Sequence, residues 1–184
     1  MRYHLLNLSF GKQRLSAEPL LGEPVPVAAI DDFPEPSAEP LILYILGHAA
    51  PDELLEGDVA RPDHSIATAI ESWRGNASTL LIWDVCFAKS FLNIERDEPW
   101  NTNYVHVFAC QRYERAWHHG GQQNHTIFST ALHNALEQFR NEPNHLSWDG
   151  LTLLLNANLG GLQTAEIEHW GGLTANDFLD QLLA

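Results

Sequence analysis

Two residues able to act as a nucleophile and a general base, Cys86 and His48, each follow a run of apolar residues. LILYIL at positions 41–46 leads into a Gly-His pair, and LLIWDV at positions 80–85 leads into the cysteine. A thiol attacks a carbonyl as the thiolate, and an imidazole within reach makes thiolate available at neutral pH. The same imidazole, once protonated, can donate to a leaving amine. The pair suffices for acyl transfer, with the backbone N–H groups of Ala49 and Cys86 as the expected oxyanion donors.

The elements that must position this pair are strands alternating with helices. The two apolar runs, and a third at 104–110, are typical of strands buried on both faces. Apolar residues at helical spacing predict helices over 64–73 and 126–140. This alternation predicts right-handed crossovers and a mostly parallel sheet with helices on both faces. Ligands bind beyond the carboxyl ends of such strands, so His48 and Cys86 would face one crevice if their strands are adjacent.

The remaining segments complete a single domain over residues 1–184. A loosely alternating stretch predicts a first strand, and the prolines and acidic residues that follow predict an irregular segment. Apolar spacing near the C-terminus predicts two further helices and a last strand, with Thr174 as the cap of the final helix. The predicted bounds are a strand at 3–10, an irregular segment at 16–40, a helix at 148–156, a strand at 163–170 and a helix at 174–183. The domain therefore divides into an N-terminal segment at 1–40, a core at 41–172 and a C-terminal helix at 173–184.

Composition excludes several classes of protein. Acidic residues outnumber basic ones 24 to 10, for a formal charge of −14, and such a surface repels phosphate backbones, so no nucleic-acid partner is expected. The two cysteines are too few for a disulfide framework. The N-terminus MRYHLLNLSFG has no signal-peptide core, and no apolar run approaches the roughly 20 residues that span a bilayer. These features predict a cytoplasmic protein that does not bind membranes.

The motifs LILYILGHAAP and LLIWDVCFAKS resemble those of caspase-like peptidases. The similarity is greatest to metacaspases and their bacterial relatives, and next to the CHAT branch. Downstream, VHVFACQRYERAW resembles the following strand of the family, and TIFSTALHNAL resembles its Phe-Thr/Ser-x-Ala-Leu helix opening. The resemblance covers about residues 41–172. It implies a three-layer α/β sandwich and a cysteine endopeptidase with His48 and Cys86 as its catalytic dyad.

The resemblance also implies a substrate class. The residue two positions before the nucleophile lines the pocket for the side chain that precedes the scissile bond, and here it is Asp84. A carboxylate there implies cleavage of proteins or peptides after Arg or Lys. Activation would come from a separate protein partner or from self-cleavage after Lys89 or Arg96. No cofactor is expected; some metacaspases need calcium, but no carboxylate set matching a calcium site is found.

Departures from the family motifs keep two other functions open. Ala49 replaces the usual Gly after the histidine, and Phe87-Ala88-Lys89 replaces the usual His-Ser-Gly after the nucleophile. These changes would suit a catalytically inactive caspase-like module that binds partners. A non-peptidase amidase or acyl transferase that uses Cys86 is the other alternative.

Other reactive residues have simpler interpretations. Cys110 also ends a predicted strand and is the competing nucleophile, but a buried core thiol is favoured because no histidine-ending strand accompanies it. His118, His119 and His125 match no closed zinc pattern and are taken as a solvated loop. Because this stretch lies near the substrate groove in the family, contacts of Arg112 or Trp117 with substrate are a further hypothesis.

Overall fold

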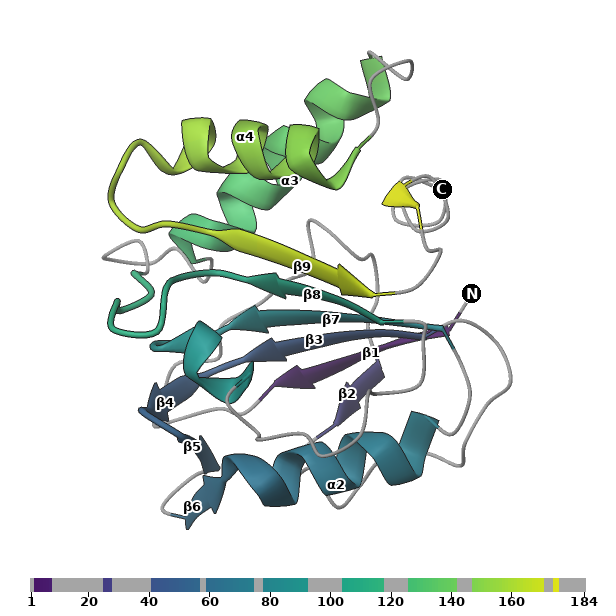
Figure 1. The fold of residues 1–184 in the computed structure, drawn as a ribbon, viewed down its shortest axis with the longest axis vertical. Coiled ribbons are helices and arrows are strands. Elements are labelled where there is room, and N and C mark those ends of the chain that lie inside the picture. Colours follow the sequence, from purple (N-terminus) through teal and green to yellow (C-terminus); the bar gives the residue numbers. More distant parts are fainter. Residues whose placement is uncertain are drawn as a thin grey trace.

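The structure is a computed structural model that describes residues 2–7, 25–27, 41–56, 59–74, 78–92, 104–117, 126–141, 147–170 and 174–175. Its centre is a six-stranded sheet in the order β2-β1-β3-β7-β8-β9 (Figure 1). All neighbours pair in parallel except the last two, which pair antiparallel. The strands are β1 (Arg2–Asn7), β2 (Val25–Val27), β3 (Leu41–Leu46), β7 (Thr79–Asp84), β8 (Tyr104–Phe108) and β9 (Glu166–Trp170).

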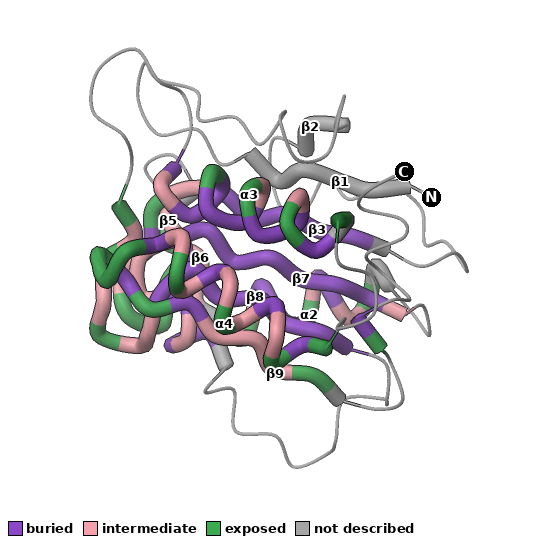
Figure 2. The backbone as a smooth tube through the Cα atoms, turned by 90° about the horizontal axis from the view of Figure 1, so that it is seen from above, coloured by how far each residue is buried: buried purple, intermediate pink, exposed green. Residues whose placement is uncertain are grey.

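Helices cover both faces of this sheet, as Figure 1 shows. Helix α2 (Asp63–Arg74) lies on one face, and α3 (Ile127–Asn141) and α4 (Trp148–Leu159) lie on the other. Because side chains alternate along a strand, each central strand contributes side chains to two hydrophobic cores, one on each face of the sheet. Ile42 and Tyr44 of β3 pack with α3 and α4, while Leu43 and Ile45 pack with α2. The central strands are buried along their length (Figure 2), so the predicted α/β fold class with a mostly parallel sheet is confirmed.

The segment before residue 41 departs from the prediction, which placed a single strand there. It contributes a second strand, β2, in which Pro26 lies opposite Leu5 of β1. Proline has no N–H to donate, and β2 is an edge strand that needs hydrogen bonds on one side only. The proline content therefore argued against a central strand but not against an edge strand. The first strand is Arg2–Asn7 rather than 3–10, and residues 8–10 lie outside the described residues.

A second, three-stranded antiparallel sheet follows directly on β3 and was not predicted. It consists of β4 (His48–Ala50), β5 (Glu53–Glu56) and β6 (Val59–Pro62). Strands of three or four residues are too short to show a periodic pattern in the sequence. Its first residue is His48, the predicted general base.

The remaining elements agree with the predictions apart from their ends. β8 ends at Phe108 rather than Cys110, and β9 begins at Glu166 rather than Gln163. Of the predicted C-terminal helix, only residues 174–175 are described, so that prediction lies largely outside the described residues. None of the helices in the described part of the chain has the length and apolar character needed to cross a membrane.

Ser147 caps the N-terminus of α4, and its replacement by alanine is expected to destabilise the fold. Its side chain accepts a hydrogen bond from the Gly150 N–H at 3.0 Å, and its backbone is extended, as an N-cap residue requires. Ser147→Ala should lower the free energy of unfolding by about 1 kcal/mol, measured by urea denaturation. Ser72→Ala, at an exposed position within α2, is the control and should leave the free energy of unfolding unchanged. Equal losses in the two variants would contradict the capping role.

Candidate active site

The carboxyl ends of β3 and β7 lie side by side. The two strands pair in parallel with Leu46 opposite Asp84, and the Gly47 N–H donates to the Asp84 carbonyl at 3.4 Å. His48 and Cys86 are each two residues beyond this last pair. The adjacency of the two strands, which was the condition for the predicted dyad, is therefore present. Both residues lie at the end of the sheet where α/β proteins bind their ligands.

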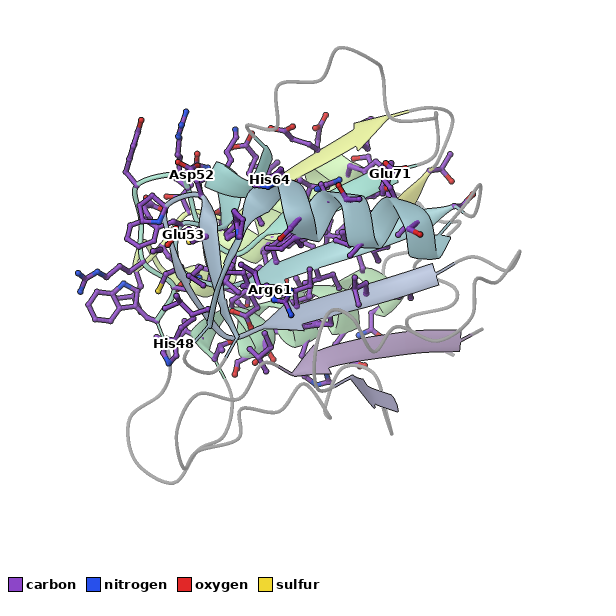
Figure 3. The ribbon with its side chains drawn as sticks, turned by 90° about the horizontal axis from the view of Figure 1, so that it is seen from below. His48, Asp52, Glu53, Arg61, His64 and Glu71 are labelled. Carbon is purple, nitrogen blue, oxygen red and sulfur yellow. The ribbon has the colours of Figure 1, made fainter. Side chains whose placement is uncertain are left out.

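His48 is the first residue of β4 and is exposed. Figure 3 shows it beyond the end of β3, on the side of the small sheet. At the turn between β4 and β5, Asp52 has a positive φ of 64°, and its N–H donates to Ser90 Oγ at 3.2 Å. Ser90 belongs to η2 (Ala88–Leu92), the short 3-10 helix that follows Cys86. One hydrogen bond thus joins the segment that carries the histidine to the segment that carries the cysteine.

Cys86 lies in a tight turn between β7 and η2 and is partly exposed. Its Sγ is 3.7 Å from the Ala116 carbonyl oxygen. Within the described residues its backbone N–H donates no hydrogen bond, which suits the predicted oxyanion role. The second predicted donor, Ala49, lies opposite Leu54 in the β4–β5 pair. The oxyanion roles of Cys86 and Ala49 stay predictions.

Cys110 is in a different environment, with 0% of its surface exposed. Its Sγ is 3.3 Å from the Val85 carbonyl oxygen and 3.4 Å from the Glu114 carbonyl oxygen. Burial raises the pKa of this thiol to about 12. The thiolate form is therefore scarce at neutral pH, and the interpretation of Cys110 as a core thiol is the one its surroundings support.

Asp84 is the last residue of β7, and only 1% of its surface is exposed. The Tyr44 hydroxyl donates to Oδ2 at 2.8 Å, and the Thr126 hydroxyl donates to the same oxygen. The other oxygen, Oδ1, is buried and has no hydrogen-bond partner among the described residues. Burial raises the pKa of this carboxyl from 3.8 to about 6. Oδ1 therefore lacks a hydrogen-bond donor in the described part of the structure. A cationic side chain from a ligand would supply that donor.

Lys89 is held in ion pairs rather than in an open loop. Its Nζ pairs with Glu166 of β9 and, at 3.3 Å, with Oε1 of Glu168. Gln111 donates to the second oxygen of Glu166 at 2.8 Å. Lys89 also lies within η2, so a peptidase would have to unwind this helix to cleave the chain after Lys89. Arg96, the other predicted cleavage position, lies outside the described residues.

The loop after β8 carries the other residues singled out in the sequence. Arg112 lies over the ring of Tyr113, 5.6 Å from its centroid, and Tyr113 is 82% exposed. Trp117 is 54% exposed. Arg112 and Trp117 both lie on this loop, and their contacts with substrate stay a prediction. His118, His119 and His125 lie outside the described residues.

The overall arrangement matches a known fold. No protein-family model and no curated protein matches the chain. Among solved structures it is similar to caspase-1 from Spodoptera frugiperda, with a TM-score of 0.53 and 11% identity, and it covers 62% of that chain while 75% of its own length is matched. The chain has a caspase-like fold. The likeness lies in the mostly parallel sheet and the helices on its two faces.

Within this caspase-like fold, the structure brings together residues that the sequence did not single out. Tyr44 lies within an apolar run, and its hydroxyl became recognisable as a partner of Asp84 only through the pairing of β3 with β7. Thr126, the residue immediately before α3, lies 42 positions after Asp84 in the chain. The signal in the sequence that could have identified Tyr44 is its hydroxyl group, a polar group within an otherwise apolar strand. Within the described ranges, no group of three or more His, Cys, Asp or Glu residues is placed to hold a metal ion.

Proposed function

We propose that this protein is a cysteine endopeptidase that uses Cys86 as nucleophile and His48 as general base and general acid. The caspase-like fold and the in-register ends of β3 and β7 support the proposal. His48 accepts the thiol proton while Sγ forms a bond to the carbonyl carbon of the scissile amide. The negative charge moves to the carbonyl oxygen, where the N–H groups of Cys86 and Ala49 stabilise it.

The second half of the reaction returns the protein to its starting state. The tetrahedral intermediate collapses, the C–N bond breaks, and protonated His48 gives its proton to the leaving amine. A thioester on Cys86 remains. Water then attacks this thioester, with His48 taking the water proton and returning it to the departing sulfur. The products are a free carboxylic acid and the original thiol.

The observation that carries the proposed specificity is Oδ1 of Asp84, which has no hydrogen-bond partner among the residues that the structure describes. An uncompensated buried carboxylate is unfavourable, and a guanidinium or ammonium supplies both the missing donor and the opposite charge. Asp84 is also only two residues before the proposed nucleophile. We therefore assign cleavage after Arg or Lys to the protein.

The test is covalent labelling with an electrophilic peptide ketone that carries Arg next to the warhead. Mass spectrometry should find the label on Cys86 of the wild-type protein, and none should form in Cys86→Ala or His48→Ala. A matched probe with Asp in place of Arg should label at least about tenfold more slowly, since it places a second carboxylate near Asp84. Labelling of Cys110 in place of Cys86, or equal rates for the two probes, would contradict the proposal. An absence of any label would favour the inactive binding module.

A further inference from the structure

The side chain of Glu114 braces the 111–117 loop, the segment that follows β8. Its Oε2 accepts hydrogen bonds from the Gln111 N–H at 3.1 Å and from the Thr164 N–H at 2.9 Å. Its Oε1 pairs with the Thr164 hydroxyl at 3.1 Å. One carboxylate therefore ties the start of this loop to the segment that connects α4 to β9.

The backbone of the same loop holds the turn that carries Cys86. The Glu114 carbonyl accepts a hydrogen bond from the Phe87 N–H at 2.8 Å. Two residues on, the Ala116 carbonyl is 3.7 Å from Cys86 Sγ. The buried Cys110 thiol, 3.4 Å from the Glu114 carbonyl, adds a third contact at the same place. The position of the loop therefore fixes the position of the proposed nucleophile.

The turn needs this support because Phe87 has a positive φ of 57°. Bulky residues rarely adopt this left-handed conformation, and they keep it only where the surrounding structure imposes it. The bond from the Phe87 N–H to the Glu114 carbonyl is one such constraint, and the bond from the Ser90 N–H to the Phe87 carbonyl, at 2.8 Å, is another. Without the first bond, we expect Phe87 to relax toward negative φ and to turn the neighbouring Cys86 away.

We propose that Glu114 is a positioning residue for Cys86. Its carboxylate fixes the 111–117 loop, and the loop carbonyls then hold the Phe87 N–H and the Cys86 thiol. The catalytic consequence rests on the proposed peptidase function, whereas the effect on the turn does not. Gln163 braces the far end of the same loop, accepting from the Trp117 N–H at 2.9 Å and donating to the Ala109 carbonyl at 2.7 Å. Because this second brace remains, we expect variants of Glu114 to fold.

Replacing Glu114 by glutamine tests whether its hydrogen bonds or its negative charge hold the loop. In Glu114→Gln, the amide oxygen can replace Oε2 and accept both N–H groups, while the amide NH₂ can donate to the Thr164 hydroxyl, which also accepts. This variant should therefore behave like the wild-type protein. Glu114→Asp keeps the charge but is one methylene shorter, and Glu114→Ala removes every side-chain contact. Both of these should release the loop.

The experiment pairs amide hydrogen exchange of Phe87, followed by NMR, with kcat and KM on a fluorogenic Arg peptide. Exchange at Phe87 should accelerate at least about tenfold in Glu114→Ala and Glu114→Asp but stay unchanged in Glu114→Gln. In the first two variants kcat should fall about 10²-fold with little change in KM, because the nucleophile is displaced while the pocket is retained. Glu137→Ala, at a half-buried glutamate of α3, is the control and should change neither quantity.

Each outcome bears on a different claim. Unchanged Phe87 exchange in both Glu114→Ala and Glu114→Asp would overturn the proposal, and so would a loss of kcat in Glu114→Gln equal to that in Glu114→Ala. If Glu114→Ala does not fold, Glu114→Asp carries the same comparison. If the exchange pattern is as expected but the wild-type protein cleaves no peptide, the brace stands and the proposed peptidase function fails.

Discussion

Cys86→Ala is expected to abolish hydrolysis of Arg-containing peptides, with kcat/KM falling at least about 10³-fold, because the reaction loses its only proposed nucleophile. Cys110→Ala should keep kcat/KM within about tenfold of the wild-type value. The Cys110 thiol is buried, its pKa is raised to about 12, and its contacts are with backbone carbonyls. The two variants remove the same side chain from positions two residues beyond the ends of the neighbouring strands β7 and β8, so each is the control for the other.

The measurement is the initial rate of cleavage of a fluorogenic Arg peptide by both variants at matched folded fraction. Circular dichroism and thermal melts establish that the variants are folded. Retained activity in Cys86→Ala would exclude this residue as the nucleophile. Loss of activity in Cys110→Ala with no change in melting temperature or in Phe87 amide exchange would move the nucleophile to Cys110.

Asp84→Asn is expected to stabilise the free protein and, at the same time, to remove its preference for basic side chains. The folded-state pKa of Asp84 is raised from 3.8 to about 6 by burial, so the folded protein binds this proton more tightly than the unfolded chain does. The stability that Asp84 contributes is therefore present below about pH 4 and is lost as the pH rises through about 6. Asparagine carries no charge at any of these pH values and avoids that loss.

Urea denaturation at two pH values tests the stability part of this prediction. At pH 7.5, Asp84→Asn should raise the free energy of unfolding by up to about 3 kcal/mol, because one pKa unit corresponds to about 1.4 kcal/mol. At pH 4 the difference should nearly vanish. Asp149→Asn, at an exposed position in the first turn of α4, is the control and should show no gain at pH 7.5. A destabilised Asp84→Asn at pH 7.5 would show that the carboxylate is satisfied in the free protein.

Matched peptides with Arg or citrulline before the scissile bond test the specificity part. The two side chains are nearly the same size, and only Arg is charged. The wild-type protein should prefer Arg by about 10²-fold, and Asp84→Asn should show little preference. The wild-type preference should fall as the pH drops below about 6, since protonated Asp84 cannot pair with a guanidinium. A preference that persists in Asp84→Asn would place the acidic pocket residue elsewhere.

These two expected results describe one trade-off. A buried carboxylate with one oxygen unpaired among the described residues lowers the stability of the free protein, and in the proposed function a basic ligand would complete it. Tyr44 and Thr126 hold the other oxygen through their hydroxyl groups.

Some features of this protein follow from the sequence by itself. The apolar runs ending at Leu46 and Val85 specify strands buried on both faces, because a parallel sheet covered by helices leaves no polar side. Helical spacing specified α2 and α3 to within a residue or two. The placement of His48 and Cys86 just beyond two such runs pointed to the end of the sheet where ligands bind.

Other features were decided only by the tertiary structure, because they depend on contacts between segments far apart in the chain. The register of β3 and β7 placed the two strand ends side by side, and no local pattern encodes a register between strands nearly 40 residues apart. The small sheet that begins at His48 has strands too short for a periodic signal. The links of Asp84 to Thr126 and of Glu114 to Thr164 span 42 and 50 positions, and each depends on folding that brings two loops or strand ends together. The sequence thus determined which residues have reactive chemistry, and the fold determined which of them meet.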